Sequence, residues 1–172
     1  DMTALHSQLG KLDKQSGQLC RKYPPQAPRI MGKMREAQEN WERLEDLASA
    51  RRVKLEDANQ LHKFLTEAKE HSNWCNNLVT SMTSGDLAND VLEAEELLAI
   101  HQERKAEIDG RKPHQSQLVE YGENLVHQKH YSSSEISKTV QHLEEVWTTL
   151  NMTWEDKKQQ LTQCYDLQVY EE

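Results

Sequence analysis

An internal repeat constrains the fold of this chain more than any other feature of its sequence. A shift of 106 residues places Trp41 on Trp147 without an insertion or a deletion. The same shift pairs Leu12 with Leu118, Leu19 with Leu125, Ile30 with Ile136, Leu44 with Leu150, Leu55 with Leu161, and Leu61 with Leu167. A period of this length predicts one structural unit that recurs, and the chain holds about 1.6 periods.

Apolar residues within each copy follow the spacing of a coiled coil. Steps of four and three residues connect, in the later copy, Ile136, Val140, Leu143, Trp147, Leu150 and Trp154. The earlier copy has the same ladder, Ile30, Met34, Ala37, Trp41 and Leu44, and a further stripe runs through Leu87, Val91, Ala94, Leu98, His101 and Ile108. This alternation marks the buried seam of helices that wind around one another with a left-handed twist. Since three helices of roughly 30 residues fit one period, we expect an all-α fold of tandem left-handed three-helix coiled-coil bundles.

The stretch between residues 29 and 82 has no Pro, and its one Gly, Gly32, lies near its start. Residues 42–61 are mostly strong helix formers. We therefore expect one helix of about 55 residues, on the order of 80 Å long, which ends one bundle and begins the next. A continuous helical linker of this kind transmits tension and torsion, whereas a Gly/Ser linker would not. The expected linker residues are Leu44, Leu55, Leu61, Leu150, Trp154 and Leu161.

Counted against this period, the chain divides into three parts. Residues 1–54 supply the end of the second helix and all of the third helix of one unit, whose first helix is missing. Residues 55–154 form a complete unit, and residues 155–172 begin the next. We expect a fragment of a longer protein, with three residues partly uncovered unless another chain or the overhang ending at Glu172 packs on them: Met34, Ala37 and Trp41.

Helix ends are marked by turn-forming and capping residues. Ser84 or Asp86 could cap the helix that follows the Ser-Gly-Asp break, and Ser132 with Glu135 has the spacing of a capping box. Pro24, Pro25 and Pro28 mark the equivalent turn of the first copy, where Pro suits the first turn of a helix. Gly110 and Pro113 predict a kink or local irregularity within a helix, not a domain boundary.

The composition fits a thin, helical architecture. Only 35% of residues are apolar and 6% aromatic, too few for a deep core. The net charge of −8 argues against nucleic-acid binding, and no apolar run approaches the ~20 residues that a membrane-spanning helix needs. Three widely spaced cysteines, Cys20, Cys75 and Cys164, favour a reducing compartment.

The candidate reactive groups have simpler structural interpretations. His71 with Cys75, or His127 with His130, offers two ligands where a structural zinc site needs four. The carboxylates at Glu93, Glu95, Glu96, Glu144 and Glu145 suit a solvated helix face better than acid–base catalysis. A metal-binding bundle enzyme would require inward-facing Glu-x-x-His motifs, which the sequence lacks. We therefore expect no enzyme activity, no catalytic residue and no cofactor or metal; a structural core is expected at Trp41, Trp74, His101 and Trp147.

These features resemble the spectrin-repeat family along the whole chain. The resemblance rests on the 106-residue period, on the paired Trp41 and Trp147, and on Trp74 in the unit's first helix. Segments 97–102 and 106–109 resemble the family's second helix, and segment 161–170 resembles the entry into a next repeat. The residues that resemble the family's second turn are Gly122, Leu125, His130, Tyr131 and Ile136. Two departures occur at turns: Lys129 replaces a common Gly, and Pro24-Pro25 replaces His-Tyr.

The resemblance also implies a function. A structural rod segment would give elasticity and spacing to an actin-based membrane skeleton at the cytoplasmic face of the plasma membrane. Its partner would be another spectrin chain, alpha or beta, in an antiparallel heterodimer, with actin contacted indirectly. As an alternative, the repeats could dock ankyrin or another membrane-attached adaptor. No nucleic acid, small-molecule substrate or transmembrane segment is expected, and His101 would be a structural residue of the core.

Overall fold

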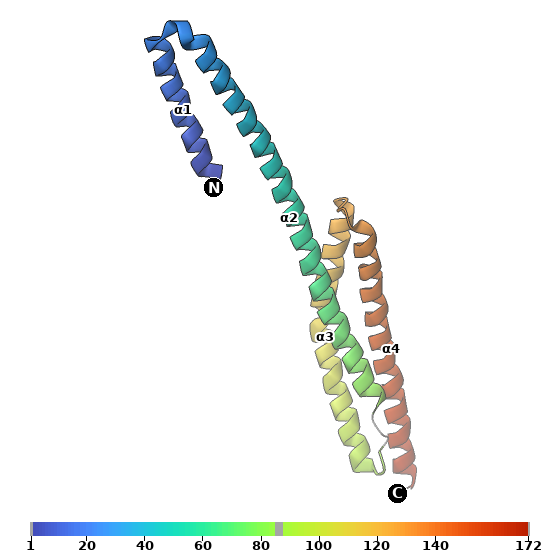
Figure 1. Cartoon of the computed structure of the whole chain (residues 1–172). Helices are drawn as coiled ribbons and strands as arrows, with labels where there is room; N and C mark the ends of the chain where they lie inside the picture. Colours follow the sequence, from blue (N-terminus) through green and yellow to red (C-terminus); the bar gives the residue numbers. More distant parts are fainter. Residues whose placement is uncertain (1, 85–87, 172) are drawn as a thin grey trace. The chain divides into compact units, whose positions relative to one another are not determined.

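The computed structural model describes residues 2–84 and 88–171, which are almost entirely helical (Figure 1). The elements are α1 (Met2–Lys22), a short 3₁₀ helix η1 (Pro24–Gln26), α2 (Ala27–Thr83), α3 (Val91–His127) and α4 (Ser133–Glu171). This confirms the all-α prediction. Contacts divide the chain into unit 1, up to Glu56, and unit 2, from Asp57 onward. Helix α2 contributes residues to both units.

Helix α2 is a single helix of 57 residues and covers the stretch 29–82, which lacks internal helix breakers. It begins directly after η1, and Pro28 stands in its first turn, where a missing backbone N–H costs no hydrogen bond. The linker is therefore helical, as its composition predicts. Helix α3 likewise continues through Gly110 and Pro113 as one helix.

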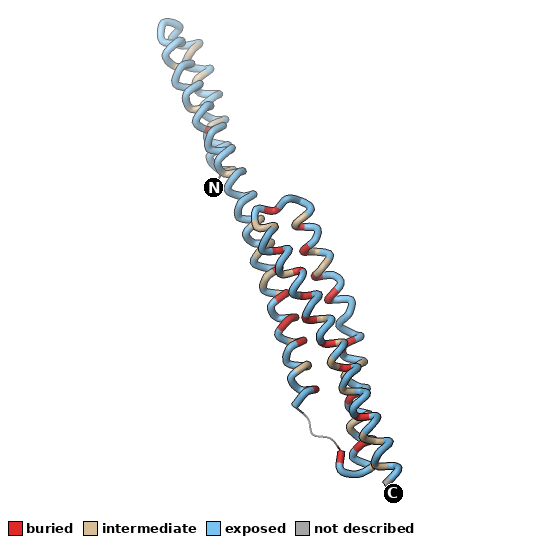
Figure 2. Tube along the Cα trace, turned by 90° about the vertical axis from the view of Figure 1, so that its right-hand side faces the viewer, coloured by how far each residue is buried: buried red, intermediate tan, exposed pale blue. Residues whose placement is uncertain are grey.

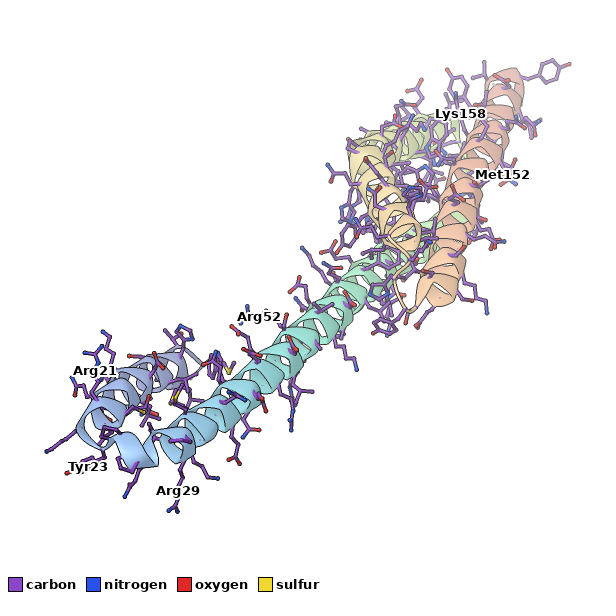
Figure 3. All side chains as sticks on the ribbon, turned by 90° about the horizontal axis from the view of Figure 1, so that it is seen from above. Arg21, Tyr23, Arg29, Arg52, Met152 and Lys158 are labelled. Atoms are coloured by element: carbon purple, nitrogen blue, oxygen red, sulfur yellow. The ribbon has the colours of Figure 1, made fainter. Side chains whose placement is uncertain are left out.

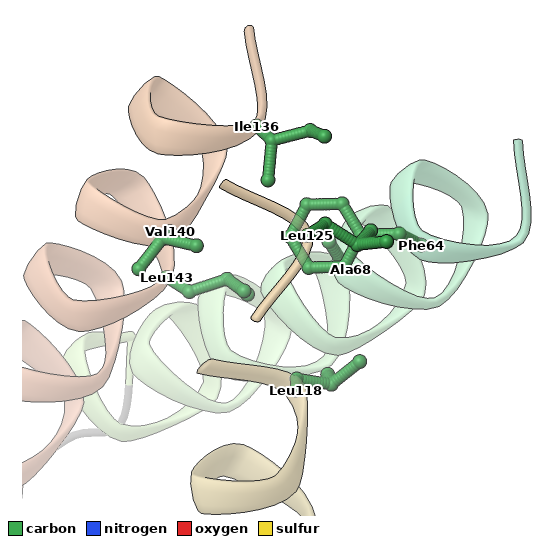
Figure 4. Packing of buried hydrophobic residues seen from close by; sticks show 7 residues of the cluster. All are labelled: Phe64, Ala68, Leu118, Leu125, Ile136, Val140 and Leu143. Carbon is green, nitrogen blue, oxygen red and sulfur yellow. The ribbon is translucent and has the colours of Figure 1, made fainter. Parts of the chain in front are cut away.

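Unit 2 is built around two consecutive apolar clusters to which all three of its helices contribute. The first cluster, shown in Figure 4, contains Phe64 and Ala68 from α2, Leu118 and Leu125 from α3, and Ile136, Val140 and Leu143 from α4. The second contains Cys75, Met82, Ile108, Val146, Leu150 and Trp154. Burying a large aliphatic or aromatic side chain contributes about 1.5–3 kcal/mol, so these seams supply the main stabilisation of unit 2.

Unit 1 has much less buried surface than unit 2. Among its described residues, Trp41 is the one buried apolar side chain, and its ring lies 5.4 Å from the ring of His6 on α1. Figure 2 shows the contrast, with buried residues spread along the helices of unit 2 and exposed residues dominating unit 1. Among the described residues, unit 1 has two α-helical segments, α1 and the first part of α2, where unit 2 has three.

The difference in burial between the two units is clear at equivalent positions of the repeat. Leu44 of unit 1 is 42% exposed, whereas its equivalent Leu150 is fully buried at 0%. Leu55 is 60% exposed, whereas Leu161 is 3% exposed. Since the residue types are identical, the surroundings of each position explain the difference, not the chemistry of the side chains. Leu150, for example, packs in a cluster with residues of α2 and α3.

The start of α3 differs from the sequence prediction. Asp90 caps the helix, and its carboxylate accepts the backbone N–H of Glu93 at 2.8 Å. The carboxylate of Glu93 in turn accepts the backbone N–H of Asn89 at 2.8 Å. Ser84 is therefore not the cap of α3, and Asp86 lies outside the described residues. The prediction was wrong because the reciprocal Asp90–Glu93 bonds fix the helix start further along the chain.

The start of α4 also differs from the predicted capping box. The backbone N–H of Ser132 donates to Nδ1 of His130 at 3.1 Å, in place of the side chain of Glu135. The Ser133 hydroxyl donates to the carbonyl of His130. Just before this turn, Lys129 adopts a left-handed backbone conformation with φ 58°, which usually favours Gly. His130 thus takes over the capping role that the sequence assigns to Glu135.

Candidate functional site

For a structural function, the candidate site is the set of contacts that hold the helices in register. The most specific of these contacts joins α3 to α4. The rings of His101 and Trp154 stack with centroids 4.9 Å apart and planes 5° from parallel. His101 Nε2–H donates to the Trp154 carbonyl at 2.8 Å, and Trp154 Nε1–H donates to the His101 carbonyl at 2.9 Å. We call this reciprocal pair the His101–Trp154 latch. It fixes the longitudinal register of α3 against α4, because a sliding helix would break both bonds.

Basic side chains surround the latch. Lys105 and Lys158 each place their ammonium group 5.2 Å from the centroid of the Trp154 ring, within range of a cation–π interaction. Burial lowers the pKa of His101, and the positive charges of Arg104, Lys157 and Lys158 act in the same direction, against the hydrogen bond to the Trp154 carbonyl. The hydrogen bond to the carbonyl requires a proton on Nε2 of His101, and burial disfavours the charged form of the ring.

A second aromatic group lies between α2, α3 and α4. The ring of His71 stacks on Trp147 at 5.7 Å and meets the edge of His114 at 5.2 Å. Its Nε2 lies 3.7 Å from Sγ of Cys75, and Nδ1 has no hydrogen-bond partner within the part of the chain that the structure describes. Trp74 donates Nε1–H to the carboxylate of Glu107 at 3.1 Å. This arrangement packs His71 as a neutral aromatic ring.

The burial of His71 makes unit 2 sensitive to acid. Burial, followed by the charges of His114 and Arg111, lowers the pKa of His71 from 6.5 to about 4. Between these values the unfolded chain binds a proton at His71 that the folded chain excludes, so stability is lost as the pH falls from about 6.5 to about 4. We expect a loss of about 3 kcal/mol, since one pKa unit corresponds to about 1.4 kcal/mol, measured by urea unfolding across this range.

A variant isolates this effect from the titration of carboxylates. His71→Gln should flatten the pH dependence of the free energy of unfolding, whatever its stability at neutral pH. The control His142→Gln removes an exposed histidine from α4 and should leave the dependence unchanged. Equal slopes in the wild type and His71→Gln would contradict the assignment.

The sequence-predicted residues occupy different environments. Of the expected core residues, Trp41 and His101 are buried, and Trp74 and Trp147 are half-buried. Of the expected linker residues, Leu150, Trp154 and Leu161 are buried within unit 2, Leu61 is half-buried, and Leu44 and Leu55 are exposed. Trp154 thus belongs to the latch, a role that its place in the sequence does not reveal.

One contact near the start of unit 2 was missed by sequence reasoning. His130 Nε2–H donates to the carbonyl of Asp57 on α2 at 2.9 Å, while Nδ1 accepts from Ser132. The turn between α3 and α4 is therefore tied to α2 close to the point where unit 2 begins. The two residues are far apart in sequence, so only the fold reveals their pairing.

Other kinds of site have little support in the described residues. Among residues 2–84 and 88–171, no three His, Cys, Asp or Glu side chains are placed to hold one metal ion. In the same ranges, no helix is apolar and long enough to cross a membrane. Unit 1 carries an apolar groove between α1 and α2, lined in part by Leu12, Leu19, Ile30, Met34 and Ala37.

Comparisons with known proteins agree with the repeat and the helical bundle. The spectrin repeat family matches residues 59–163. The erythrocytic alpha chain 1 of spectrin from Mus musculus is 29% identical over 170 residues, and the spectrin beta chain from Drosophila melanogaster is 28% identical over 174 residues. Both alignments cover 99% of this chain but only 7% and 8% of the relatives, respectively. The family match covers more than half of the chain and coincides with the bundle of unit 2, and on this evidence the chain belongs to the spectrin repeat family.

Proposed function

We propose that this chain is a structural rod segment that gives elasticity and spacing to an actin-based membrane skeleton. The observation that carries the proposal is helix α2, which runs without interruption from Ala27 to Thr83 and contributes to both units. A load applied to one unit then reaches the next through backbone hydrogen bonds, and extension must melt helix before the chain lengthens. The proposal includes no catalytic step and no cofactor.

A third helix would complete unit 1. The support is the exposure of Leu44 at a position whose equivalent, Leu150, is buried in a cluster with residues of α2, α3 and α4. The apolar groove between α1 and α2 offers the surface on which such a helix would pack. On this proposal, residues 1–54 belong to one repeat, 55–154 form a complete repeat, and 155–172 enter another. Trp41, Trp74, His101 and Trp147 would act as core residues of these repeats.

The spectrin relatives suggest the partners and the place of action. Matches to both alpha and beta chains support lateral association with a second spectrin chain, which would be antiparallel, and an indirect link to actin. The segment would then lie in the cytoplasm, at the inner face of the plasma membrane. Co-sedimentation with purified spectrin chains would test the lateral association.

The linker role can be tested with one substitution in α2. Lys54 is an exposed helical residue close to the boundary between the units. Lys54→Pro removes one helical hydrogen bond and clashes with the preceding turn, at a cost of about 3 kcal/mol. We expect amide exchange in residues 27–56 to accelerate by about 100-fold. The reason is that the proline separates this part of α2 from the part in unit 2, whose packed helix otherwise nucleates it. Residues 64–83 should remain protected.

Lys54→Ala is the matched control, because it removes the same exposed side chain and keeps the helix. Its exchange pattern should equal that of the wild type. Suppose that the amides of residues 27–56 exchange at the same rate in Lys54→Pro and in Lys54→Ala. The helical linker then does not connect the stabilities of the two units, and the proposed role of α2 is wrong.

A further inference from the structure

Helix α3 is anchored unevenly along its length. Its buried residues are, in chain order, Ala94, His101, Ile108, Gln115, Leu118, Gly122 and Leu125. The part of α3 before Gly110 buries one large apolar side chain, that of Ile108. The shorter part after Pro113 buries two, those of Leu118 and Leu125. Because the burial of large apolar side chains is the main force that holds a helix in a bundle, the first part of α3 is held more weakly than the second.

A weak point in the backbone separates these two parts of α3. Pro113 has no N–H, so the carbonyl of Asp109 has no donor four residues later in the helix. Gly110 adds backbone freedom, and nothing lies within 4 Å of a Cβ atom built on it. Just beyond, Gln115 Nε2–H donates to the carbonyl of Leu143 on α4 at 3.2 Å, which fixes the start of the second part. The backbone of α3 is therefore easiest to bend or melt just before this bond.

The His101–Trp154 latch attaches the first part of α3 to α4. Its two hydrogen bonds, of 2.8 and 2.9 Å, are both buried. Lys158, which is labelled on α4 in Figure 3, places its ammonium group 5.2 Å from the centre of the Trp154 ring. By contrast, the hydrogen bond from Trp74 to Glu107 is exposed, and exposed hydrogen bonds compete with water. The latch is thus the most specific attachment of this part of the helix.

We propose that residues 91–109 form a strap, which detaches from α2 and α4 about a hinge at Gly110–Pro113 and which the latch closes. Detachment breaks both hydrogen bonds of the latch and withdraws Ile108 from the second apolar cluster. It uncovers Leu150 and Trp154 of that cluster, while the first cluster stays closed. The latch thus sets how often this end of unit 2 opens. All of these contacts lie within unit 2, so the strap does not depend on the proposed rod function.

Native-state hydrogen exchange of the full chain, at low concentrations of urea, tests the strap. A detached helix of this length is marginal in water, so its amides exchange whenever the strap opens. We expect residues 95–109 to share one opening reaction and to exchange about 100-fold faster than residues 118–127, since each additional large side chain that stays buried slows opening by more than about tenfold. Rates that fall steadily from residue 95 to residue 109 would indicate fraying from the helix end and would overturn the proposal. Equal rates in the two ranges would overturn it as well.

Trp154→Phe tests the latch, because it keeps an aromatic ring and removes the indole N–H that the His101 carbonyl accepts. Exchange of residues 95–109 should accelerate by at least about tenfold, the effect of one buried hydrogen bond. Exchange of residues 118–127 should change by less than about threefold. Trp147→Phe is the matched control on the same helix, because the Trp147 ring stacks on α2 and not on α3. It should leave the ratio of the two rates unchanged, and an equal acceleration of both ranges in Trp154→Phe would contradict the latch.

Pro113→Ala tests the hinge. The alanine supplies the N–H that the carbonyl of Asp109 lacks, so opening of the strap must break one more helical hydrogen bond. Exchange of residues 95–109 should slow by about tenfold. Lys112→Ala is the control, because it changes the exposed neighbouring residue and leaves the missing bond as it is. If the rate in Pro113→Ala equals that in Lys112→Ala, the hinge does not lie at this point and the proposal is wrong.

Discussion

Leu150→Ala is expected to lower the free energy of unfolding of unit 2 by about 3 kcal/mol, within the range for a leucine removed from a closed core. Leu150 is 0% exposed and packs in the second apolar cluster with Ile108 and Trp154. The lost side chain leaves a cavity between three helices that cannot fully collapse. Urea unfolding followed by circular dichroism measures the change.

Leu44→Ala is the matched variant, because Leu44 is the same residue one period earlier. Its side chain is 42% exposed, so the loss should stay below about 1 kcal/mol. The contrast between the two variants measures the effect of the third helix on one position of the repeat. Similar losses of stability in Leu44→Ala and Leu150→Ala would contradict the difference in burial between these two leucines. They would indicate that a third helix covers Leu44 in solution.

Gly122→Ala is expected to destabilise unit 2 by about 1–3 kcal/mol, although alanine favours helix over glycine. A Cβ atom at this position would lie 2.5 Å from Cγ2 of Val140 and 2.8 Å from Cζ of Phe64. Both neighbours belong to the first apolar cluster, so neither can move into open space. Thermal unfolding of unit 2 should shift to lower temperature.

Gly110→Ala, in the same helix, should instead stabilise unit 2. Nothing lies within 4 Å of a Cβ at Gly110, so the variant should gain about 0.5–1 kcal/mol from reduced backbone entropy. Phe64→Leu should offset part of the loss in Gly122→Ala, because the smaller side chain vacates space beside residue 122. An equal response to alanine at Gly110 and Gly122 would contradict the close packing of α3 against Phe64 and Val140.

The sequence predicts the helices better than it predicts the contacts between them. The 106-residue period and the heptad ladders indicate an all-α chain, and the scarcity of Gly and Pro predicts the long helix α2, which the structure has from Ala27 to Thr83. These signals are local or periodic, so one sequence reveals them. The actual burial of Leu44 depends instead on how many helices surround it, which periodicity does not encode.

The specific contacts depend on pairs of residues that are distant in sequence. Trp154 has the spacing of a seam residue, but its hydrogen bond to the His101 carbonyl appears only when α3 and α4 are placed side by side. The four-residue pattern predicts a capping box in which Glu135 accepts the backbone N–H of Ser132, whereas His130 supplies that acceptor. His130 also reaches the carbonyl of Asp57, which no local pattern predicts.

Single-molecule stretching of the full chain tests the continuous helix most directly. With handles near the two ends, unit 2 and residues 27–56 should lose their structure in one step in the wild type, because helix in the first part of α2 is nucleated by its continuation in unit 2. Lys54→Pro should separate this event into two steps, with residues 27–56 extending at lower force. Two independent steps in the wild type, at the same forces as in Lys54→Pro, would contradict a linker helix that carries load between the repeats.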